Sequence, residues 1–226
     1  DLIRALTSTA VAVLGTDQLA ALTTIQASKL TSAQVTALSA TQLASISTAN
    51  FATLTSDGIA ALSTTQAKAM TSDQVKSMST TQASSLTSSA LSVMTSSQVS
   101  AFSNADLAAI TTQAIQGLTV AGLNALSSAQ LTSLTSDQVK ALGTAQVAGL
   151  NTAQIQSLST AQFNSLGTSQ VAALSATQVG VIETADIAAL TTAAIATLNT
   201  AHLAALSTAQ VVALSTAQVA NLGSAQ

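Results

Sequence analysis

The chain has 226 residues, of which only 6% are charged, and its formal net charge is −3. An ordinary soluble domain carries charge on about a quarter of its residues, so this composition is not that of a typical enzyme. Such sparse charge also excludes nucleic acid as a partner, because nucleic-acid binding depends on clustered Lys and Arg.

Hydroxyl-bearing residues interrupt the apolar residues about every eight positions, whereas a membrane-spanning helix needs roughly 18 apolar residues in a row. We therefore predict no membrane span. The chain has no Cys, which excludes disulfides and thiolate metal sites. It opens at Asp1 without an initiator Met or a signal peptide and stops in mid-repeat at Gln226, so we expect a segment of a longer protein or filament.

A strict period of eight residues runs along the chain. Every eighth residue from Leu6 through Leu222 is Leu, Ile, Met or Phe, which gives 28 positions. We name this position a, and the seven that follow it b to h. Residues 1–226 are accordingly interpreted as a single array of about 28 octapeptide repeats in one register, with no linker.

Each octad is predicted to form one short helix that begins at position b. That position is Ser, Thr, Gly or Asn except at Glu183, and position e is Gln eighteen times. Ser or Thr followed three residues later by Gln is the capping box that starts a helix, as in Ser207 to Gln210. Gly or Asn at b, as in Gly143 and Asn151, could also end the preceding helix as its left-handed residue.

In chain order, the first octads are the least regular, since the stretch from Leu2 to Ala10 matches the pattern poorly. Two later octads, 55–58 (TSDG) and 119–122 (TVAG), lose the Gln at e, and residues 206–226 repeat it almost perfectly. Charges support the helices, because Asp falls in the expected first turns and Lys near the ends, the polarity that the helix dipole favours. These residues are Asp17, Asp57, Asp73, Asp106, Asp137 and Asp186, and Lys29, Lys68, Lys76 and Lys140.

Position f is Val, Ile, Leu or Phe, or in a few octads Ala, and it lies on the same helix face as the next a, as Val211 and Leu214 do. Burying such a pair contributes roughly 3–6 kcal/mol, while ordering eight residues costs about 1–2 kcal/mol each in backbone entropy. One octad therefore cannot fold alone. The predicted fold is all-α, a solenoid in which the a and f side chains of successive octads share one core, and Phe51, Phe102 and Phe163 belong to that core.

Two other structures could carry the same period of eight residues. In a continuous helix, eight residues overshoot two turns by about 80°, so the apolar stripe would wind around the rod. In a strand, a and f would point to opposite faces, and Ala and Gln are poor strand formers. A β-solenoid with 16-residue coils remains the alternative.

Two resemblances follow from these residues. The stretch LTSDQVKAL, residues 134–142, resembles the capped helix that opens each repeat of the TAL effectors of plant pathogens, and this likeness implies only a helix. The Ser/Thr/Ala/Gln/Val-rich array as a whole resembles the tandem short-repeat tracts of large bacterial cell-surface or secreted adhesin-type proteins. That resemblance implies a rod, stalk or fibre located outside the cell or at its surface.

No residue stands out as a catalytic, cofactor-binding or metal-binding group. His202 is the only histidine and occupies an e position, where it substitutes for the capping Gln. Asp186 and Glu183 flank one predicted helix start, and we interpret them as helix-terminus residues rather than an acid–base pair. The Gln column has two interpretations that can hold together, capping of its own helix and a ladder of bonds between neighbouring coils.

The predicted function is that of a structural, extracellular rod or filament-forming repeat protein that stacks end to end, with no enzyme activity and no cofactor. The alternative is a binding module that grips a peptide or glycan on the solenoid surface. A minor alternative is ice binding by the rows of Thr at b and c.

Overall fold

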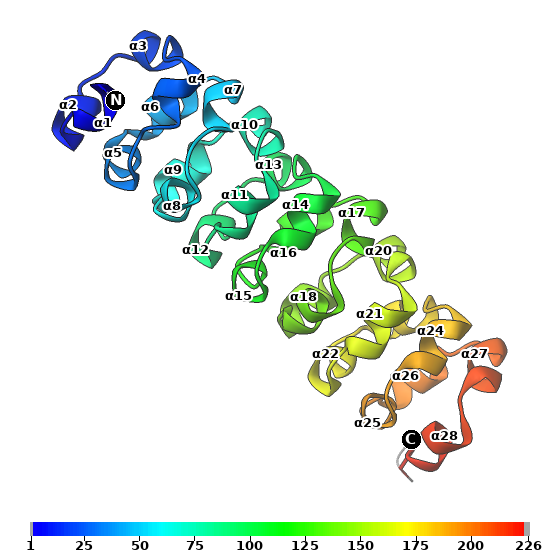
Figure 1. Cartoon of the computed structure of the whole chain (residues 1–226). Coiled ribbons are helices and arrows are strands. Elements are labelled where there is room, and N and C mark those ends of the chain that lie inside the picture. Colours follow the sequence, from blue (N-terminus) through cyan, green and yellow to red (C-terminus); the bar gives the residue numbers. More distant parts are fainter. Residues whose placement is uncertain (1, 224–226) are drawn as a thin grey trace. The chain divides into compact units, whose positions relative to one another are not determined.

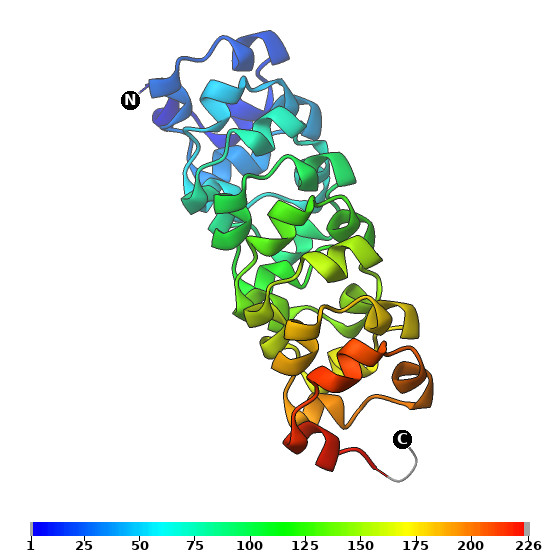
Figure 2. The same ribbon diagram turned by 90° about the vertical axis from the view of Figure 1, so that its right-hand side faces the viewer.

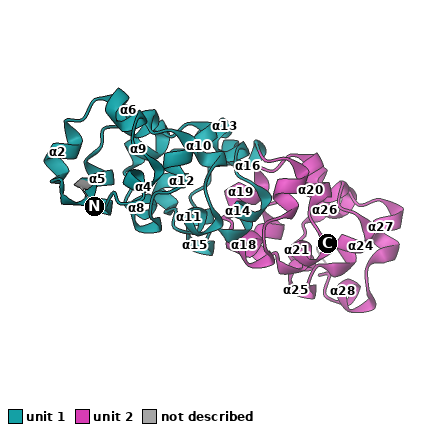
Figure 3. Ribbon diagram, turned by 45° about the horizontal axis from the view of Figure 1, so that its top comes forward, with its two compact units in different colours: residues 1–125 teal, residues 126–226 magenta. Residues whose placement is uncertain are grey.

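The computed structural model describes residues 2–223, and the end of the last part-repeat, residues 224–226, lies outside them. The described residues form 28 short α-helices and contain no strand (Figure 1). From α2 onward each helix belongs to one octad, with b as its N-cap, so the all-α expectation is confirmed and the β-solenoid alternative is wrong. The chain divides into two compact units, residues 1–125 and 126–226 (Figure 3).

In the first unit the helices form three stacks, because each helix packs against the helix three places further along the chain. The first stack is α1 (Leu2–Ala5), α4 (Thr24–Ala27), α7 (Thr48–Phe51), α10 (Ser72–Lys76), α13 (Ser96–Ser100) and α16 (Val120–Asn124). The second is α2 (Ser8–Ala12), α5 (Ser32–Ala37), α8 (Ser56–Ala60), α11 (Thr80–Ser84) and α14 (Asn104–Ala109). The third is α3 (Thr16–Ala20), α6 (Ala40–Ser45), α9 (Thr64–Ala69), α12 (Ser88–Leu91) and α15 (Thr112–Ile115).

The second unit repeats this arrangement with its own three stacks, and Figure 2 shows the short helices and their connections from another side. One stack is α17 (Ser128–Thr132), α20 (Thr152–Ser157), α23 (Ala176–Gly180) and α26 (Thr200–Ala204). The next is α18 (Ser136–Ala141), α21 (Thr160–Ser165), α24 (Thr184–Ala189) and α27 (Thr208–Ala213). The last is α19 (Thr144–Ala148), α22 (Thr168–Ala172), α25 (Thr192–Ile195) and α28 (Thr216–Ala220).

The solenoid core of each unit is built from the a and f side chains, as the octad pattern predicts. Val75 at f has no exposed surface and Met78 at the next a is 6% exposed. Phe51, Phe102 and Phe163 are buried, which confirms their place in the core. Three helices complete one turn of the solenoid, so f and a side chains in the interior of a stack lie between the turns before and after them.

The connection between successive helices differs from one sequence expectation. Gly143 and Asn151 were expected to be able to end the preceding helix in the left-handed region, but their φ angles are −69° and −76°. None of the residues 2–223 has a positive φ. The physical reason is that an N-cap requires extended backbone, so a residue that begins one helix cannot also be the left-handed end of another.

Candidate functional site

The Gln side chain at position e begins its own helix through a capping box. In α10, Gln74 accepts a hydrogen bond from the backbone N–H of Thr71 through Oε1, at 2.9 Å. The hydroxyl of Thr71 in turn accepts from the backbone N–H of Gln74, at 3.0 Å. These two bonds satisfy N–H groups that a helix start otherwise leaves without a partner.

The same Gln side chain also bonds to the turn before it. Gln74 Nε2 donates to the carbonyl oxygens of Leu43 at 2.9 Å and Ile46 at 2.8 Å, which lie 31 and 28 residues earlier. Its side chain is almost fully buried. We call this repeated set of amide-to-carbonyl bonds the amide ladder. Both bonds recur at Gln34, Gln66, Gln82, Gln98, Gln162, Gln170, Gln178, Gln210 and Gln218.

Capping and laddering are the two interpretations of the Gln column, and the structure contains both in one side chain. The oxygen of the amide serves its own helix and the nitrogen serves the neighbouring turn. The ladder partners are backbone carbonyls, which every residue has, so no residue type in the sequence marks them. In the sequence, only the periodic recurrence of Gln at e could suggest these bonds. An amide is suited to this position because it offers an acceptor and two donors in one planar group.

His202 performs the task of the missing Gln in α26. Its Nδ1 accepts from the backbone N–H of Asn199 at 3.2 Å, and its Nε2 lies 2.7 Å from the carbonyl oxygen of Leu174, 28 residues earlier. A carbonyl oxygen only accepts, so the proton of the neutral ring lies on Nε2. His202 thus both caps its helix and bonds to the preceding turn.

Asp186 and Glu183 have different surroundings although they begin the same helix, α24. Asp186 is buried, and its Oδ1 accepts a hydrogen bond from the hydroxyl of Thr160 on α21 at 2.7 Å. Glu183 is exposed, and its side chain makes no capping bond to α24. Asp186 therefore contacts the neighbouring turn, while Glu183 faces solvent.

The two ends of the described chain expose different groups. At the N-terminal end, Gln18 and Gln26 cap their helices through Oε1, and their side chains are exposed. At the C-terminal end, Val211 and Val219 occupy f positions and are 50% and 49% exposed, whereas f side chains within the array are buried. We call these the N-terminal face and the C-terminal face.

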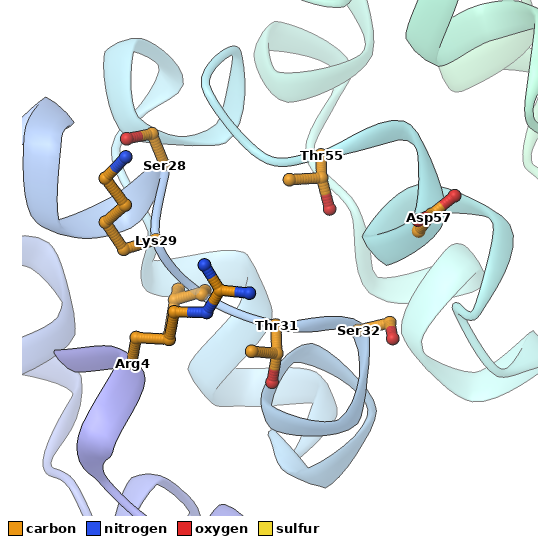
Figure 4. A pocket seen from close by; sticks show the side chains of 8 residues that line it. Arg4, Ser28, Lys29, Thr31, Ser32, Thr55 and Asp57 are labelled. Carbon is orange, nitrogen blue, oxygen red and sulfur yellow. The ribbon is translucent and has the colours of Figure 1, made fainter. Parts of the chain in front are cut away.

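Two of the hollows lie beside octads that have no Gln at e. Gly58 replaces it in α8, and a hollow of about 300 Å³ lies beside Leu30, Thr31, Thr55 and Asp57, with Arg4 and Lys29 also lining it (Figure 4). A second hollow, of about 170 Å³, lies in α12 and α15 of the third stack. It is lined by Leu86, Thr87, Ser88, Thr111, Gln113 and Ala114, where Ala114 replaces the Gln.

A search of residues 2–223 finds no cluster of three His, Cys, Asp or Glu side chains that could hold a metal ion. Over the same residues, each helix is too short or too polar to cross a membrane.

These features define a class of protein, the α-solenoids built from very short tandem repeats. The chain belongs to the ALTTAQ repeat family, whose model matches well over half of it, at residues 43–80, 99–136, 121–152, 147–181, 179–216 and 198–226. The stretch ALSTAQ at 205–210 differs from the family name by one letter and runs from position h to position e. The search of curated proteins gives no match.

Proposed function

We propose that this chain is a structural protein whose copies stack end to end into a fibre or stalk, located outside a bacterial cell or at its surface. The location rests on the compositional resemblance to adhesin-type repeat tracts. The stacking rests on one observation, the complementarity of the N-terminal and C-terminal faces. Each face lacks what the other offers.

The N-terminal face offers amide donors. Gln18 and Gln26 hold their Oε1 atoms against their own helix starts, as the Gln residues of the amide ladder do, and their side chains are exposed. Leu14 and Leu22, at position a, are only half-buried there. Most later turns use the same kinds of groups, a Gln amide and an apolar residue at a, to pack on the turn before them.

The C-terminal face offers the matching acceptors and apolar surface. Within the array, backbone carbonyls near the end of a helix accept hydrogen bonds from the Nε2 of a Gln 28 or 31 residues later, as the carbonyls of Ile46 and Leu43 do. The corresponding carbonyls of Leu206 and Leu214, together with half-exposed Val211 and Val219, offer the same surface to a second copy. Because the two faces differ, the contact is heterologous and propagates as a fibre instead of closing into a dimer.

Size-exclusion chromatography with light scattering and negative-stain microscopy of residues 1–226 test this proposal. With rising concentration, we expect the mass to grow in steps of one chain, with fibres at the highest concentrations. The double variants Gln18→Glu/Gln26→Glu and Val211→Asp/Val219→Asp each block one face and are expected to stay monomeric. Carboxylates would face carbonyl oxygens in the first pair, and charges would be buried in the second.

Mixing the two blocked variants gives the sharpest test, because each keeps one intact face. The expected product is a one-to-one dimer that does not grow further. The matched control is Gln156→Glu, which carries a Gln-to-Glu change at an exposed side chain and is expected to assemble as the unmodified chain does. Monomers of the unmodified chain at every concentration would refute end-to-end stacking.

A further inference from the structure

Within residues 3–223, large apolar side chains that are exposed occur at the two ends of the array and not between them. They are Val13, Ile25, Val211, Val212 and Val219. Position a shows the same contrast, since every a residue from Leu30 to Leu198 is buried. Three a residues at each end are only half-buried, namely Leu6, Leu14 and Leu22, and Leu206, Leu214 and Leu222. Because three octads make one turn, each end leaves the apolar surface of one turn partly uncovered.

Three of these exposed side chains lie outside the a and f columns, and two of the three are unusual for their octad positions. Val212 is the only apolar residue larger than Ala at position g, and Ile25 is the only one at position d. Both columns otherwise hold small, polar or charged residues. Val212 is 79% exposed, Val13 at position h is 78% exposed and Ile25 is 74% exposed. All three would gain free energy if a further turn covered them.

Contacts between neighbouring turns show which octad positions meet. Position g meets position h of the next turn, 25 residues later. The hydroxyl of Thr132 at g donates to the carbonyl oxygen of Ser157 at h, at 2.9 Å. A Cβ atom placed on Gly180 at g would lie 3.8 Å from the Cβ atom of Ala205 at h. The g–h contact therefore recurs along the array.

Position e meets position f of the turn before it, 23 residues earlier. A Cβ atom placed on Gly122 at e would lie 3.8 Å from the Cβ atom of Val99 at f. The same pair occurs at Gly58 and Val35, where the corresponding distance is 3.9 Å. An e residue thus covers an f side chain of the preceding turn.

We propose that stacked copies join in one register, in which the next copy continues the octad count after a shift of 28 octads, or 224 residues. The inference rests on the proposed end-to-end stacking and specifies which side chains meet there. Val13 of the next copy then follows Val212 by 25 positions, which is the g–h spacing. The two most exposed valines therefore pack on each other.

The same shift supplies partners for the half-exposed valines at f. Ala10 and Gln18 of the next copy follow Val211 and Val219 by 23 positions, which is the e–f spacing, so each valine is covered. Gln18 also follows Leu214 by 28 positions, which is the spacing of the amide ladder. Its Nε2 therefore donates to the Leu214 carbonyl of the preceding copy.

Ile25 of the next copy meets Gly223 in this register, 26 positions after it. Positions b and d at this spacing lie together within the array, as Thr31 and Asp57 do where they line one hollow (Figure 4). Gly223 has no side chain, so it leaves room for an Ile at d where other octads have shorter residues. The exposed apolar residues of both ends thus gain a neighbour from one shift.

Shifts of one octad more or less do not give these contacts. A shift of 27 octads would place α1 of the next copy, residues 2–5, at positions 218–221, which α28 and its C-cap occupy. A shift of 29 octads would place Ala5 beside Val212 and Val13 beside Ala220, so that the two valines no longer meet. Of the three shifts, the shift of 28 octads alone pairs the exposed valines.

Disulfide trapping tests the register, because the chain has no Cys and Cβ atoms 3.8 Å apart suit a disulfide. Two single-cysteine chains are mixed, oxidised with oxidised glutathione and separated on a non-reducing gel. Ala10→Cys with Val211→Cys, and Gln18→Cys with Val219→Cys, should give about tenfold more cross-linked dimer than either chain alone, because the contact holds both thiols at a high effective concentration. Gln18→Cys with Val211→Cys is the matched control for a slip of one octad and should stay at the level of the single chains.

A positive control within one chain is Val99→Cys/Gly122→Cys, which should form the e–f disulfide. Growth in mass by light scattering without the two expected cross-links, or with preference for the slipped pair, would overturn the register and leave end-to-end stacking in place. A mass of one chain at every concentration, with no cross-link in any mixture, would overturn the stacking and the register with it.

A charge pair at Val13 and Val212 tests the g–h contact independently. Both side chains are mostly exposed in the single chain, so the changes leave the fold intact. Val13→Lys and Val212→Asp each remove the apolar contact and are expected to weaken association about threefold to tenfold. The double variant brings opposite charges together at every junction and should associate about threefold more tightly than the two single effects combined. A double variant as weak as the combined single effects would overturn the pairing of Val13 with Val212.

Discussion

Replacing the buried Gln74 by Met tests whether the amide ladder stabilises the solenoid. The change keeps the side-chain length but removes the bonds to Thr71, Leu43 and Ile46. Each such bond contributes about 0.5–1.5 kcal/mol net, and buried partners left without a bond cost more. We therefore expect the free energy of unfolding to fall by about 2–4 kcal/mol.

The chain supplies a matched control for this experiment. Gln26 has the same capping box, with Oε1 2.9 Å from Thr23 N, but its side chain is exposed, and among the bonds of residues 2–223 none joins its Nε2 to another turn. Gln26→Met therefore removes the cap alone, at a cost of about 0.5–1 kcal/mol. The difference between the two variants, roughly 2 kcal/mol, measures the contribution of the ladder bonds.

A second change at the same residue separates the cap from the ladder. Gln74→Glu keeps an oxygen for Thr71 N–H and replaces the NH₂ by an oxygen that faces the carbonyls of Leu43 and Ile46. We expect it to destabilise at least as much as Gln74→Met, whereas Gln26→Glu should change stability by no more than about 0.5 kcal/mol. Urea unfolding followed by circular dichroism is the assay, with a midpoint lowered by about 1 M for the Gln74 variants. Equal losses at Gln26 and Gln74 would show that the ladder bonds contribute nothing.

Three further expectations can be checked by the same unfolding assay. Phe51→Ala should lower the free energy of unfolding by about 3–5 kcal/mol, because the side chain is fully buried. Val211 occupies the same octad position but is half exposed, so Val211→Ala should lower it by less than about 1 kcal/mol. Similar losses in the two variants would contradict the proposed core. Gly117→Ala would place a Cβ atom onto the Ser88 carbonyl and should lower the free energy of unfolding by about 2 kcal/mol or more. At Gly143 a Cβ atom has room, so Gly143→Ala should be near neutral. Tolerance of both changes would show that Gly117 does not lie tightly against the Ser88 backbone. His202→Gln restores the usual amide and should preserve or raise the urea midpoint of unfolding. His202→Ala should lower the free energy of unfolding by about 2 kcal/mol. Equal midpoints for the two variants would show that the bond to Leu174 does not contribute to stability.

Much of the fold follows from local chemistry that the sequence displays directly. Capping boxes such as Ser207 to Gln210 mark where each helix begins, and the a and f residues mark what must be buried. The number of helices per turn depends on how bulky side chains such as Phe51 and Leu54 pack across turns, which no local pattern encodes. Three stacks therefore emerge only in the structure.

The ladder was only half predictable, and the reason lies in its acceptors. The periodic Gln suggested bonds between coils, but the carbonyls of Leu43 and Ile46 belong to the backbone, and the spacing of 28 and 31 residues depends on the solenoid turn. The left-handed helix ends failed as a prediction because Gly143 has to serve as an N-cap.

The direction of the ladder bonds has a consequence for biosynthesis. Each ladder amide, from Gln34 onward, donates to carbonyls 28 or 31 residues closer to the N-terminus, that is, to chain already made by the ribosome. Every newly emerged octad can therefore dock at once on a finished turn, and none waits for partners at the far end of the polypeptide. Such short sequence separations favour rapid folding during translation and limit the time for which apolar octads remain available to aggregate.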